Sequence, residues 1–265
     1  LRSPGLIVLL LLAVINTAAG LWLTQTTYGT PSHPLTAQII SNIIDGFAIF
    51  LLIIAVFYGG ELVWRERDVK ISEIIDSTPT ANWAITIPKV LAIFCILLLL
   101  NMAAMATGLI FQTIKGASEY GITSYVGWFI LPVTVEMLMI AVLAVFFQAL
   151  SPNKYVGWGL FFAYFIAGIF LNNMGYSNAL YRYSVNPAEP LSDMNGAGGF
   201  SYGAWVLRSY WLAFGVILLV IAHLVWPRGT DTRWRSRLKR VRPGLRGAPL
   251  ALIGAAVVVM LGAGG

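Results

Sequence analysis

The residues that could support catalysis in this chain are few and widely spaced. Gly199-Phe200-Ser201-Tyr202-Gly203 matches the G-x-S-x-G pattern, in which a sharp turn between a strand and a helix exposes a nucleophilic serine. A hydrolase of this kind needs a large sheet and a histidine close to the serine. The only histidine outside the apolar segments is His33, in another loop, so we interpret the match as coincidental.

Other catalytic and metal-binding patterns do not occur in the sequence. The single cysteine, Cys95, lies within an apolar run, and two histidines, His33 and His223, are too few and too far apart for a zinc or bis-histidine haem site. Neither the phosphate-binding pattern G-x-x-x-x-G-K-[ST] nor the metalloprotease pattern H-E-x-x-H is present. We expect the chain to be no enzyme and to hold no cofactor or metal of its own.

Three polar residues, Asp45, Asn101 and Glu136, interrupt apolar segments. A charge at the bilayer centre costs at least ~2.5–3.5 kcal/mol on insertion scales, so the two carboxyl groups need a partner, a cavity, an interfacial position or a proton. Two interpretations stay open. Either these residues line a polar translocation path, or a neighbouring hydroxyl or amide satisfies each of them where helices pack.

The composition indicates that most of the chain lies in a membrane. Of the 265 residues, 58% are hydrophobic and 11% are charged, and the mean hydropathy is +0.79. Soluble domains carry about 25% charged residues, and a helical span needs ~20 mostly apolar residues. Seven segments meet this need: Gly5–Leu23, Gln38–Tyr58, Val90–Leu109, Val126–Leu150, Tyr155–Asn172, Ser209–Trp226 and Pro249–Gly265. The sequence therefore predicts an all-α fold, a polytopic bundle of transmembrane helices.

The distribution of basic residues predicts an amino terminus on the inner side of the membrane. With that orientation, only Lys115, Arg182 and Arg208 of the 17 Lys and Arg residues lie outside. The other 14 lie in inner segments, eight of them in PRGTDTRWRSRLKRVRPGLRG after the sixth span. Segments rich in Lys and Arg resist translocation. We interpret this basic cluster as a topology anchor that contacts anionic lipid, with no binding of nucleic acid.

The inner segment between the second and third spans, GELVWRERDVKISEIIDSTPTANW, predicts an amphipathic helix over residues 60–77. At 100° per residue, most apolar side chains gather on one face and most charged ones on the other. Glu61 with Arg65, and Glu66 with Lys70, have the spacing of i,i+4 ion pairs. The helix is either an interfacial anchor for the loop or a docking surface for a cytoplasmic partner.

The longest outer segment, residues 173–208, contains YRYSVNPAEPLSDMNGAGGFSYG. Its tyrosines, prolines and glycines, with little charge, predict an ordered cap or a re-entrant element over the outer ends of the helices. The candidate motif residues in this segment are Tyr181, Arg182, Tyr183, Asp193 and Asn195.

The charged inner segment, followed by WAITIPKVLAIF, resembles the membrane subunits of ABC exporters of the type 2 class. In that class the corresponding helix docks on the ATPase. The resemblance implies that the polar coupling residues are Glu61, Arg65, Glu66, Arg67 and Asp68. The glycine-threonine that usually follows this cluster is replaced here by Val69-Lys70-Ile71.

A narrower resemblance covers the whole chain. SPNKYVGW, LYRYSVNPAEPLSDMNGAGGF and VWPRGTDTRWRSRLK resemble the second permease half of bacterial proteins that fuse such segments to an aminopeptidase N-like zinc peptidase. The resemblance implies a six-helix permease unit over residues 1–247 and a seventh span over 248–265 that leads outward to a further domain. It also implies a multi-pass protein of the bacterial inner membrane. The expected partners are an ABC ATPase subunit that binds ATP and Mg²⁺, a second permease half and the lipid bilayer.

Two other functions stay open. In the first, the chain is a membrane anchor or scaffold for an extracytoplasmic peptidase domain and transports nothing. In the second, it is an ion-coupled carrier that uses Asp45 and Glu136. Such carriers contain broken helices and internal repeats, and neither is evident in this sequence.

Overall fold

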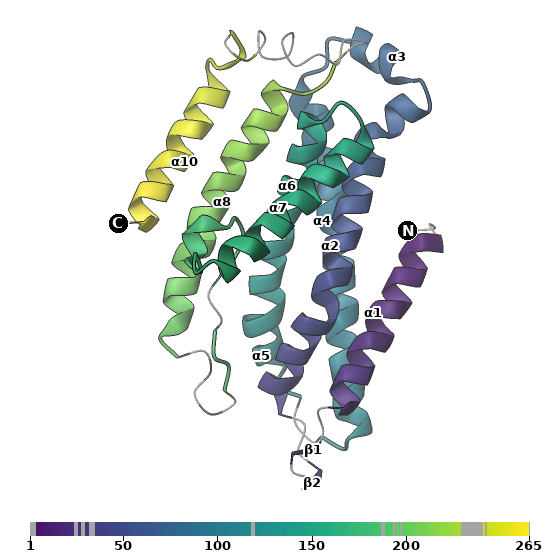
Figure 1. The fold of residues 1–265 in the computed structure, drawn as a ribbon, viewed down its shortest axis with the longest axis vertical. Helices are drawn as coiled ribbons and strands as arrows, with labels where there is room; N and C mark the ends of the chain where they lie inside the picture. Colours follow the sequence, from purple (N-terminus) through teal and green to yellow (C-terminus); the bar gives the residue numbers. More distant parts are fainter. Residues whose placement is uncertain are drawn as a thin grey trace. The chain divides into compact units, whose positions relative to one another are not determined.

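The structure is a computed structural model, and its described part is almost entirely helical (Figure 1). It describes residues 4–23, 26–27, 30–31, 35–117, 120–186, 189–192, 194, 196, 198–228, 241 and 243–264. The helices are α1 (Pro4–Leu23), α2 (Thr36–Asp68), α3 (Ser72–Ser77), α4 (Asn82–Ile114), α5 (Ile122–Ser124), α6 (Leu131–Leu150), α7 (Lys154–Asn173), α8 (Phe200–Leu224) and α10 (Ala248–Gly264). A π-helix, η1 (Tyr125–Ile130), joins α5 to α6, and η2 (Ala179–Tyr181) is a 3₁₀ turn. Two strands of two residues each, β1 (Thr26–Thr27) and β2 (Thr30–Pro31), pair antiparallel. Because all other described elements are helices, the all-α prediction is confirmed.

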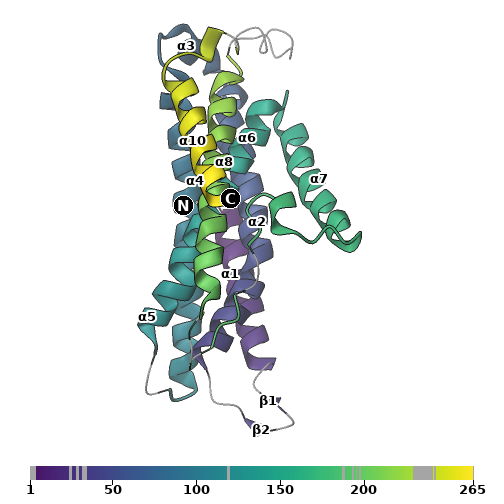
Figure 2. The same ribbon diagram turned by 90° about the vertical axis from the view of Figure 1, so that its left-hand side faces the viewer.

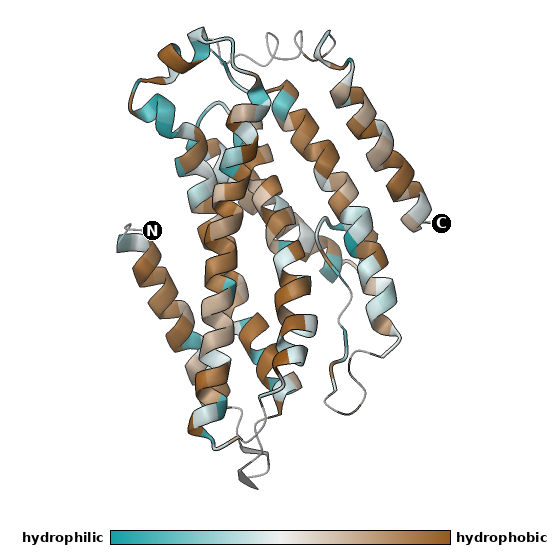
Figure 3. Cartoon of the chain, turned by 180° about the vertical axis from the view of Figure 1, so that it is seen from behind, coloured by the Kyte–Doolittle hydropathy of each residue, from teal (hydrophilic) through white to brown (hydrophobic). Residues whose placement is uncertain are grey.

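Six of these helical segments are long and apolar enough to cross a membrane: α1, α2, α4, residues 122–150, α7 and α8. Each coincides with one of the first six predicted spans, so the prediction of a multi-pass helical membrane protein is confirmed at this level. The predicted seventh span forms α10, a shorter apolar helix of 17 residues. Figure 3 shows apolar residues along these helices and hydrophilic residues gathered where α2 leads into α3.

The predicted amphipathic helix over residues 60–77 is wrong in its boundaries. The second span continues as one helix through Gly59 and Gly60 to Asp68, and only residues 72–77 form a separate helix, α3. The break is a Schellman-type C-cap, because the Ile71 N–H donates to the Glu66 carbonyl and the Lys70 N–H to the Arg67 carbonyl. Lys70 takes the left-handed conformation with φ 60° that this cap requires.

The two glycines do not end α2, because they serve helix packing. A Cβ on Gly59 would lie 3.0 Å from the Ala144 Cβ of α6, and one on Gly60 would collide with the Trp158 indole of α7. Small residues at such positions let neighbouring helix backbones approach closely, as is common where membrane helices pack.

The described residues form two compact units, to each of which α2, α4 and the α5–α6 segment contribute. Unit 1 consists of Leu1–Ile54, Cys95–Met137 and Ala188–Gly203, and unit 2 consists of Ala55–Phe94, Leu138–Pro187 and Ala204–Gly265. In unit 1, the fully buried Tyr125 donates to the Gln112 side chain at 3.1 Å, and Gln112 donates to the Thr36 hydroxyl at 3.1 Å. This chain of hydrogen bonds joins η1, α4 and α2 in the unit 1 core.

The π-helix before α6 has a local cause in the sequence. Pro132, the second residue of α6, has no N–H to donate to a carbonyl in the preceding turn, and its ring crowds that turn. A wider π-turn over Tyr125–Ile130 accommodates the proline without ending the helix. The predicted fourth span therefore remains continuous from residue 122 to 150.

In unit 2, α7 is the least buried of the long helices. Its buried residues, Gly157 and Phe161, lie in its first eight positions, and the rest of the helix exposes apolar side chains. Figure 2 shows α7 leaning away from α6 toward its C-terminal end, and Figure 1 shows that end near the level of the middle of α8. After α7, the chain continues through η2 to Tyr183, which is buried in unit 2.

Candidate functional site

The acidic residues at the end of α2 form ion pairs with lysines of two other helices. The Lys89 ammonium of α4 lies 2.6 Å from Glu66 Oε1 and also donates to the Leu62 carbonyl at 2.6 Å. At the start of α7, the Lys154 ammonium lies 3.1 Å from Glu61 Oε1 and 3.0 Å from Asp68 Oδ2. Glu61 and Asp68 are seven positions apart, so they share one face of the helix and both face Lys154.

These pairings correct the ion pairs predicted from sequence. Glu61 with Arg65, and Glu66 with Lys70, are not paired among the described side chains, and both acids bond to distant lysines instead. Arg65 is exposed, and the Arg67 guanidinium lies over the Trp64 ring with Cζ 5.2 Å from the ring centroid. Three of the five predicted coupling residues therefore fasten α2 within unit 2.

A buried polar contact supplements the ion pairs. The Trp64 indole N–H donates to Gln148 Oε1 of α6 at 2.8 Å. The Gln148 Nε2 in turn donates to the backbone carbonyl of Lys154 at a longer 3.4 Å. Gly157 lies against the Gln148 amide so closely that any side chain there would collide with it. A buried hydrogen bond contributes about 1 kcal/mol net, and leaving either partner unpaired costs more.

The connection from α3 to α4 is fixed to the end of α8. Asn82 Nδ2 donates to the His223 carbonyl at 2.8 Å, and the Trp83 and His223 rings stack with centroids 3.9 Å apart. The Arg228 guanidinium donates to the Thr80 carbonyl. By contrast, α3 itself buries no residue. We call this region of unit 2, with the ends of α2 and α8 and the start of α4, the α3 end.

The polar residues predicted within the spans do not gather in one cleft. Asp45 is exposed and lines a cleft of about 870 Å³ in unit 1, together with Gln38, Ser41 and Glu189. Glu136 is half-buried on α6 and Asn101 is fully buried on α4, and neither lines that cleft. The Asn101 amide has no hydrogen-bond partner among the described residues.

The predicted outer motif contains one deeply buried residue, Tyr183. Its hydroxyl donates to the Met139 carbonyl of α6 at 3.2 Å, and its ring packs edge-on against Trp211 of α8 with centroids 5.6 Å apart. A Cβ on Gly215 would lie 2.8 Å from the Tyr183 hydroxyl, so only glycine leaves room for it. Met139 and Gly215 both lie in the middle of their helices, so this segment enters the interior of unit 2.

The other residues of that motif are more exposed or not described. Tyr181 is exposed and Arg182 is half-buried, whereas Asp193 and Asn195 lie outside the described residues. The G-x-S-x-G pattern falls at the start of α8, and no strand longer than a single bridge residue precedes it in the described part of that segment. The strand–turn–helix context of a nucleophilic serine is therefore missing there. His33 also lies outside the described residues.

Comparison with protein-family models, with curated proteins and with solved structures finds no match for the chain. The class that the fold defines is that of a multi-pass helical membrane protein.

Sequence reasoning missed Lys89 and Lys154 as partners of the α2 acids, and Gln148 as the partner of Trp64. One signal was available in the sequence. Lys89 and Lys154 each lie directly before a predicted span, on the same predicted side of the membrane as the acid-rich segment. Which lysine pairs with which acid depends on helix rotation and crossing, and the sequence does not specify these.

Replacing Lys89 by methionine tests the importance of the pairing with Glu66. The change leaves a half-buried carboxylate and the Leu62 carbonyl without their shared donor, so we expect the free energy of unfolding to fall by about 1–3 kcal/mol. Denaturant unfolding in detergent micelles measures the effect. The exposed Arg65→Met is the control, with an expected change within about 0.5 kcal/mol. Equal stability of the two variants would contradict the assignment.

Replacing Tyr183 by phenylalanine tests its anchoring hydrogen bond. The ring contacts remain while the bond to the Met139 carbonyl is lost, so we expect a destabilisation of about 1 kcal/mol. Thermal unfolding in micelles checks this, with Tyr181→Phe at an exposed position as the matched control. We expect Gly215→Val to destabilise more than Tyr183→Phe, because its side chain collides with the phenol. A Tyr183→Phe protein indistinguishable from the control would refute an anchoring role.

Proposed function

We propose that the chain is the permease domain or subunit of an ATP-driven transporter of the ABC type, which works with a separate cytoplasmic ATPase. The observation that supports this best is the exposed connection between α2 and α4, residues 69–81. Its short helix α3 has no fully buried residue, while the helices on both sides of it are fastened by ion pairs and hydrogen bonds.

The exposed connection has the composition of a protein-binding surface. Its apolar side chains Val69, Ile71 and Ile74 are exposed by 57%, 44% and 69%, and Glu73 is exposed beside them. Contiguous exposed apolar groups with a polar rim are typical of sites that bind protein or membrane. We call these four residues the α3 surface.

The helix ends on both sides of α3 are connected in a way that could transmit a displacement of α3 to the spans. Lys89 joins α4 to α2, and Asn82 and Trp83 join the start of α4 to His223 of α8. A partner that moves α3 would therefore move the ends of three helices together. Nucleotide-driven transport needs such a coupled element, because ATP binding must shift the permease between two conformations.

The proposed docking surface differs from the one implied by the resemblance. Glu61, Glu66 and Asp68 bond to lysines within unit 2, so their charges are engaged before any partner arrives. The residues left for a partner are those of the α3 surface. In this proposal the acids position the coupling element, and Val69, Ile71, Glu73 and Ile74 contact the ATPase.

The orientation and the remaining partners belong to the same proposal. The excess of Lys and Arg in the segments predicted as inner, which include the α2–α4 connection, supports a cytoplasmic α3 end and a bacterial inner-membrane location. ATP and Mg²⁺ are bound by the ATPase. A second permease half completes the pathway in this proposal, as the resemblance to the type 2 class implies.

Replacing Ile74 by glutamate tests the docking surface. The chain is purified from its native membrane in mild detergent, and copurifying proteins are identified by mass spectrometry and assayed for ATP hydrolysis. We expect a P-loop ATPase with the wild-type chain and roughly a tenfold loss with Ile74→Glu, as for an interface position at which substitution costs more than 1 kcal/mol. Ile74→Leu, which keeps the apolar contact, is the matched control.

Two results would contradict the proposal. If no ATPase copurifies with the wild-type chain, the membrane anchor for an extracytoplasmic domain becomes the better interpretation. If an ATPase copurifies equally with wild type, Ile74→Glu and Glu73→Lys, the α3 surface is not its docking site. Glu66→Lys is unsuitable for this test, because it replaces the ion pair with Lys89 by two like charges, and a loss of binding would then not separate docking from a disturbed end of α2.

A further inference from the structure

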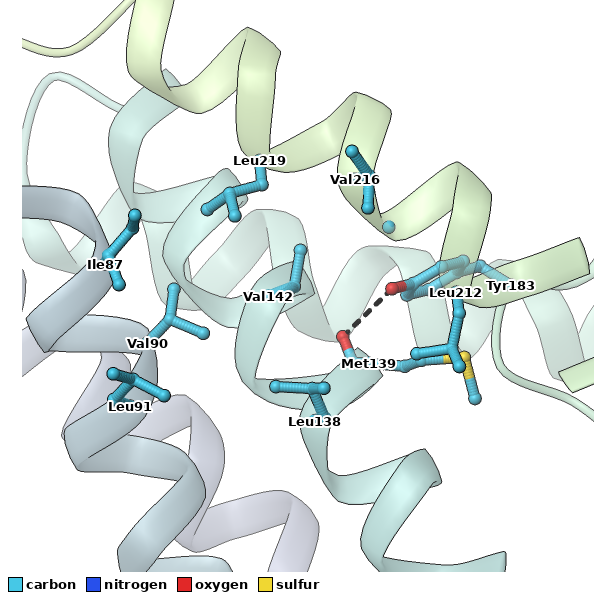
Figure 4. Close-up of a pocket in the computed structure, with 11 residues that line it drawn as sticks. Ile87, Val90, Leu91, Leu138, Met139, Val142, Tyr183, Leu212, Val216 and Leu219 are labelled. Carbon is cyan, nitrogen blue, oxygen red and sulfur yellow. Dashed lines mark hydrogen bonds between the residues drawn. The ribbon is translucent and has the colours of Figure 1, made fainter. Parts of the chain in front are cut away.

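An apolar cavity of about 240 Å³ lies inside unit 2 between α4, α6 and α8 (Figure 4). Figure 4 shows side chains of all three helices directed toward one space, with the Tyr183 phenol at one end. The residues that carry the argument are Val90 and Leu91 of α4, Met139 and Val142 of α6, and Val216 of α8.

The walls of this cavity present no polar surface. The only side-chain hydroxyl in the lining, that of Tyr183, is already bonded to the Met139 carbonyl. Water needs several polar partners to occupy a cavity, whereas apolar cavities of about 150 Å³ stay dry and accept small hydrocarbons. The cavity therefore suits a hydrocarbon group and excludes polar ligands.

The cavity opens sideways between α4 and α8. Ile87, Leu91 and Val216 line it and are also exposed by 41%, 49% and 37%, so the mouth lies between two apolar helices. Val216 lies well within α8, two-thirds of the way along this 25-residue candidate span. At that depth the surrounding medium is the hydrocarbon core of the bilayer, which supplies acyl chains and little else.

The Tyr183 side chain lies at one end of the cavity (Figure 4). Tyr183 is held there by its hydrogen bond and by its close fit against Gly215. A ligand that enters between α4 and α8 therefore meets the fixed Tyr183 side chain. An apolar space of about 240 Å³ fits the terminal part of a single flexible chain.

We infer that this cavity binds one acyl chain of a bilayer lipid, inserted between α4 and α8 up to Tyr183. The site needs no ATPase and no second permease half, so the inference goes beyond the proposed function and does not depend on it. It separates a specifically bound lipid from the lipids that merely surround the exposed helices.

The test uses the full chain in nanodiscs of phosphatidylcholine that carries a photoreactive diazirine near the end of one acyl chain. After irradiation, tandem mass spectrometry locates the adducts. Met139, Val142 and Val90 are only 1%, 7% and 4% exposed, so they are labelled only by a chain inside the cavity. Val258 of α10, 70% exposed, reports on surrounding lipid. We expect adducts at both kinds of position in the wild-type protein.

Val216→Phe adds a ring at the mouth, and Val258→Phe adds the same ring on the exposed face of α10. We expect Val216→Phe to lower labelling of Met139 and Val142 roughly tenfold, as steric exclusion from an apolar pocket does, and to leave α10 labelling unchanged. Val258→Phe should leave the cavity adducts intact. Leu91→Phe blocks the mouth from the α4 side and serves if Val216→Phe does not fold. Absence of adducts at Met139 and Val142 in wild type, or their persistence in both mouth variants, would overturn the inference.

Discussion

The pairing of two lysines with the acids of α2 is the interaction on which unit 2 depends. Lys89 and Lys154 belong to helices that run from the same end of the unit, and each reaches a carboxylate on the last turns of α2. The Lys89 ammonium also donates to the Leu62 carbonyl, so removing this buried side chain leaves two acceptors without their shared donor. The Lys154 pairs are more exposed and contribute less to stability. The helix α3 has no fully buried residue, and its half-buried Ser72, Ile75 and Asp76 share a small pocket with Glu66 and Arg67 of α2.

Those pairs also explain why α2 is longer than its apolar stretch. Glu61, Glu66 and Asp68 would favour a solvated loop if they were unpaired, but each has a cation within 3.1 Å. The helix therefore continues past its apolar residues until a left-handed Lys70 ends it. A segment of mixed charge indicates that its charged side chains need partners. It does not indicate whether those partners lie in the same chain or in another molecule.

The sequence was sufficient to predict the helical class and the first six spans, because runs of ~20 apolar residues have few alternatives in a chain with so little charge. Helix ends within polar segments were not predictable to the same degree. The predicted boundary between span and amphipathic helix falls at Gly59 and Gly60, which instead serve as contact points, because Ala144 and Trp158, the groups they contact, are 85 and 98 positions away. Tyr183 was included in the outer motif, but its depth depends on Gly215 and Met139, which no local pattern connects to it.

A membrane changes what exposure means in this structure. The exposed leucines, valines and isoleucines of α1, α7 and α10 need no partner, because lipid chains solvate them as well as protein does. Exposed backbone groups do need a partner, because lipid hydrocarbon offers no hydrogen bond to an N–H or C=O group. Residues 174–178 follow α7, with Gly175 at φ 91° and Met174 and Tyr176 exposed by 71% and 55%. The N–H groups of Met174, Gly175 and Tyr176 donate to carbonyls of the last turn of α7, so the left-handed turn at Gly175 ends the helix while keeping these exposed donors paired.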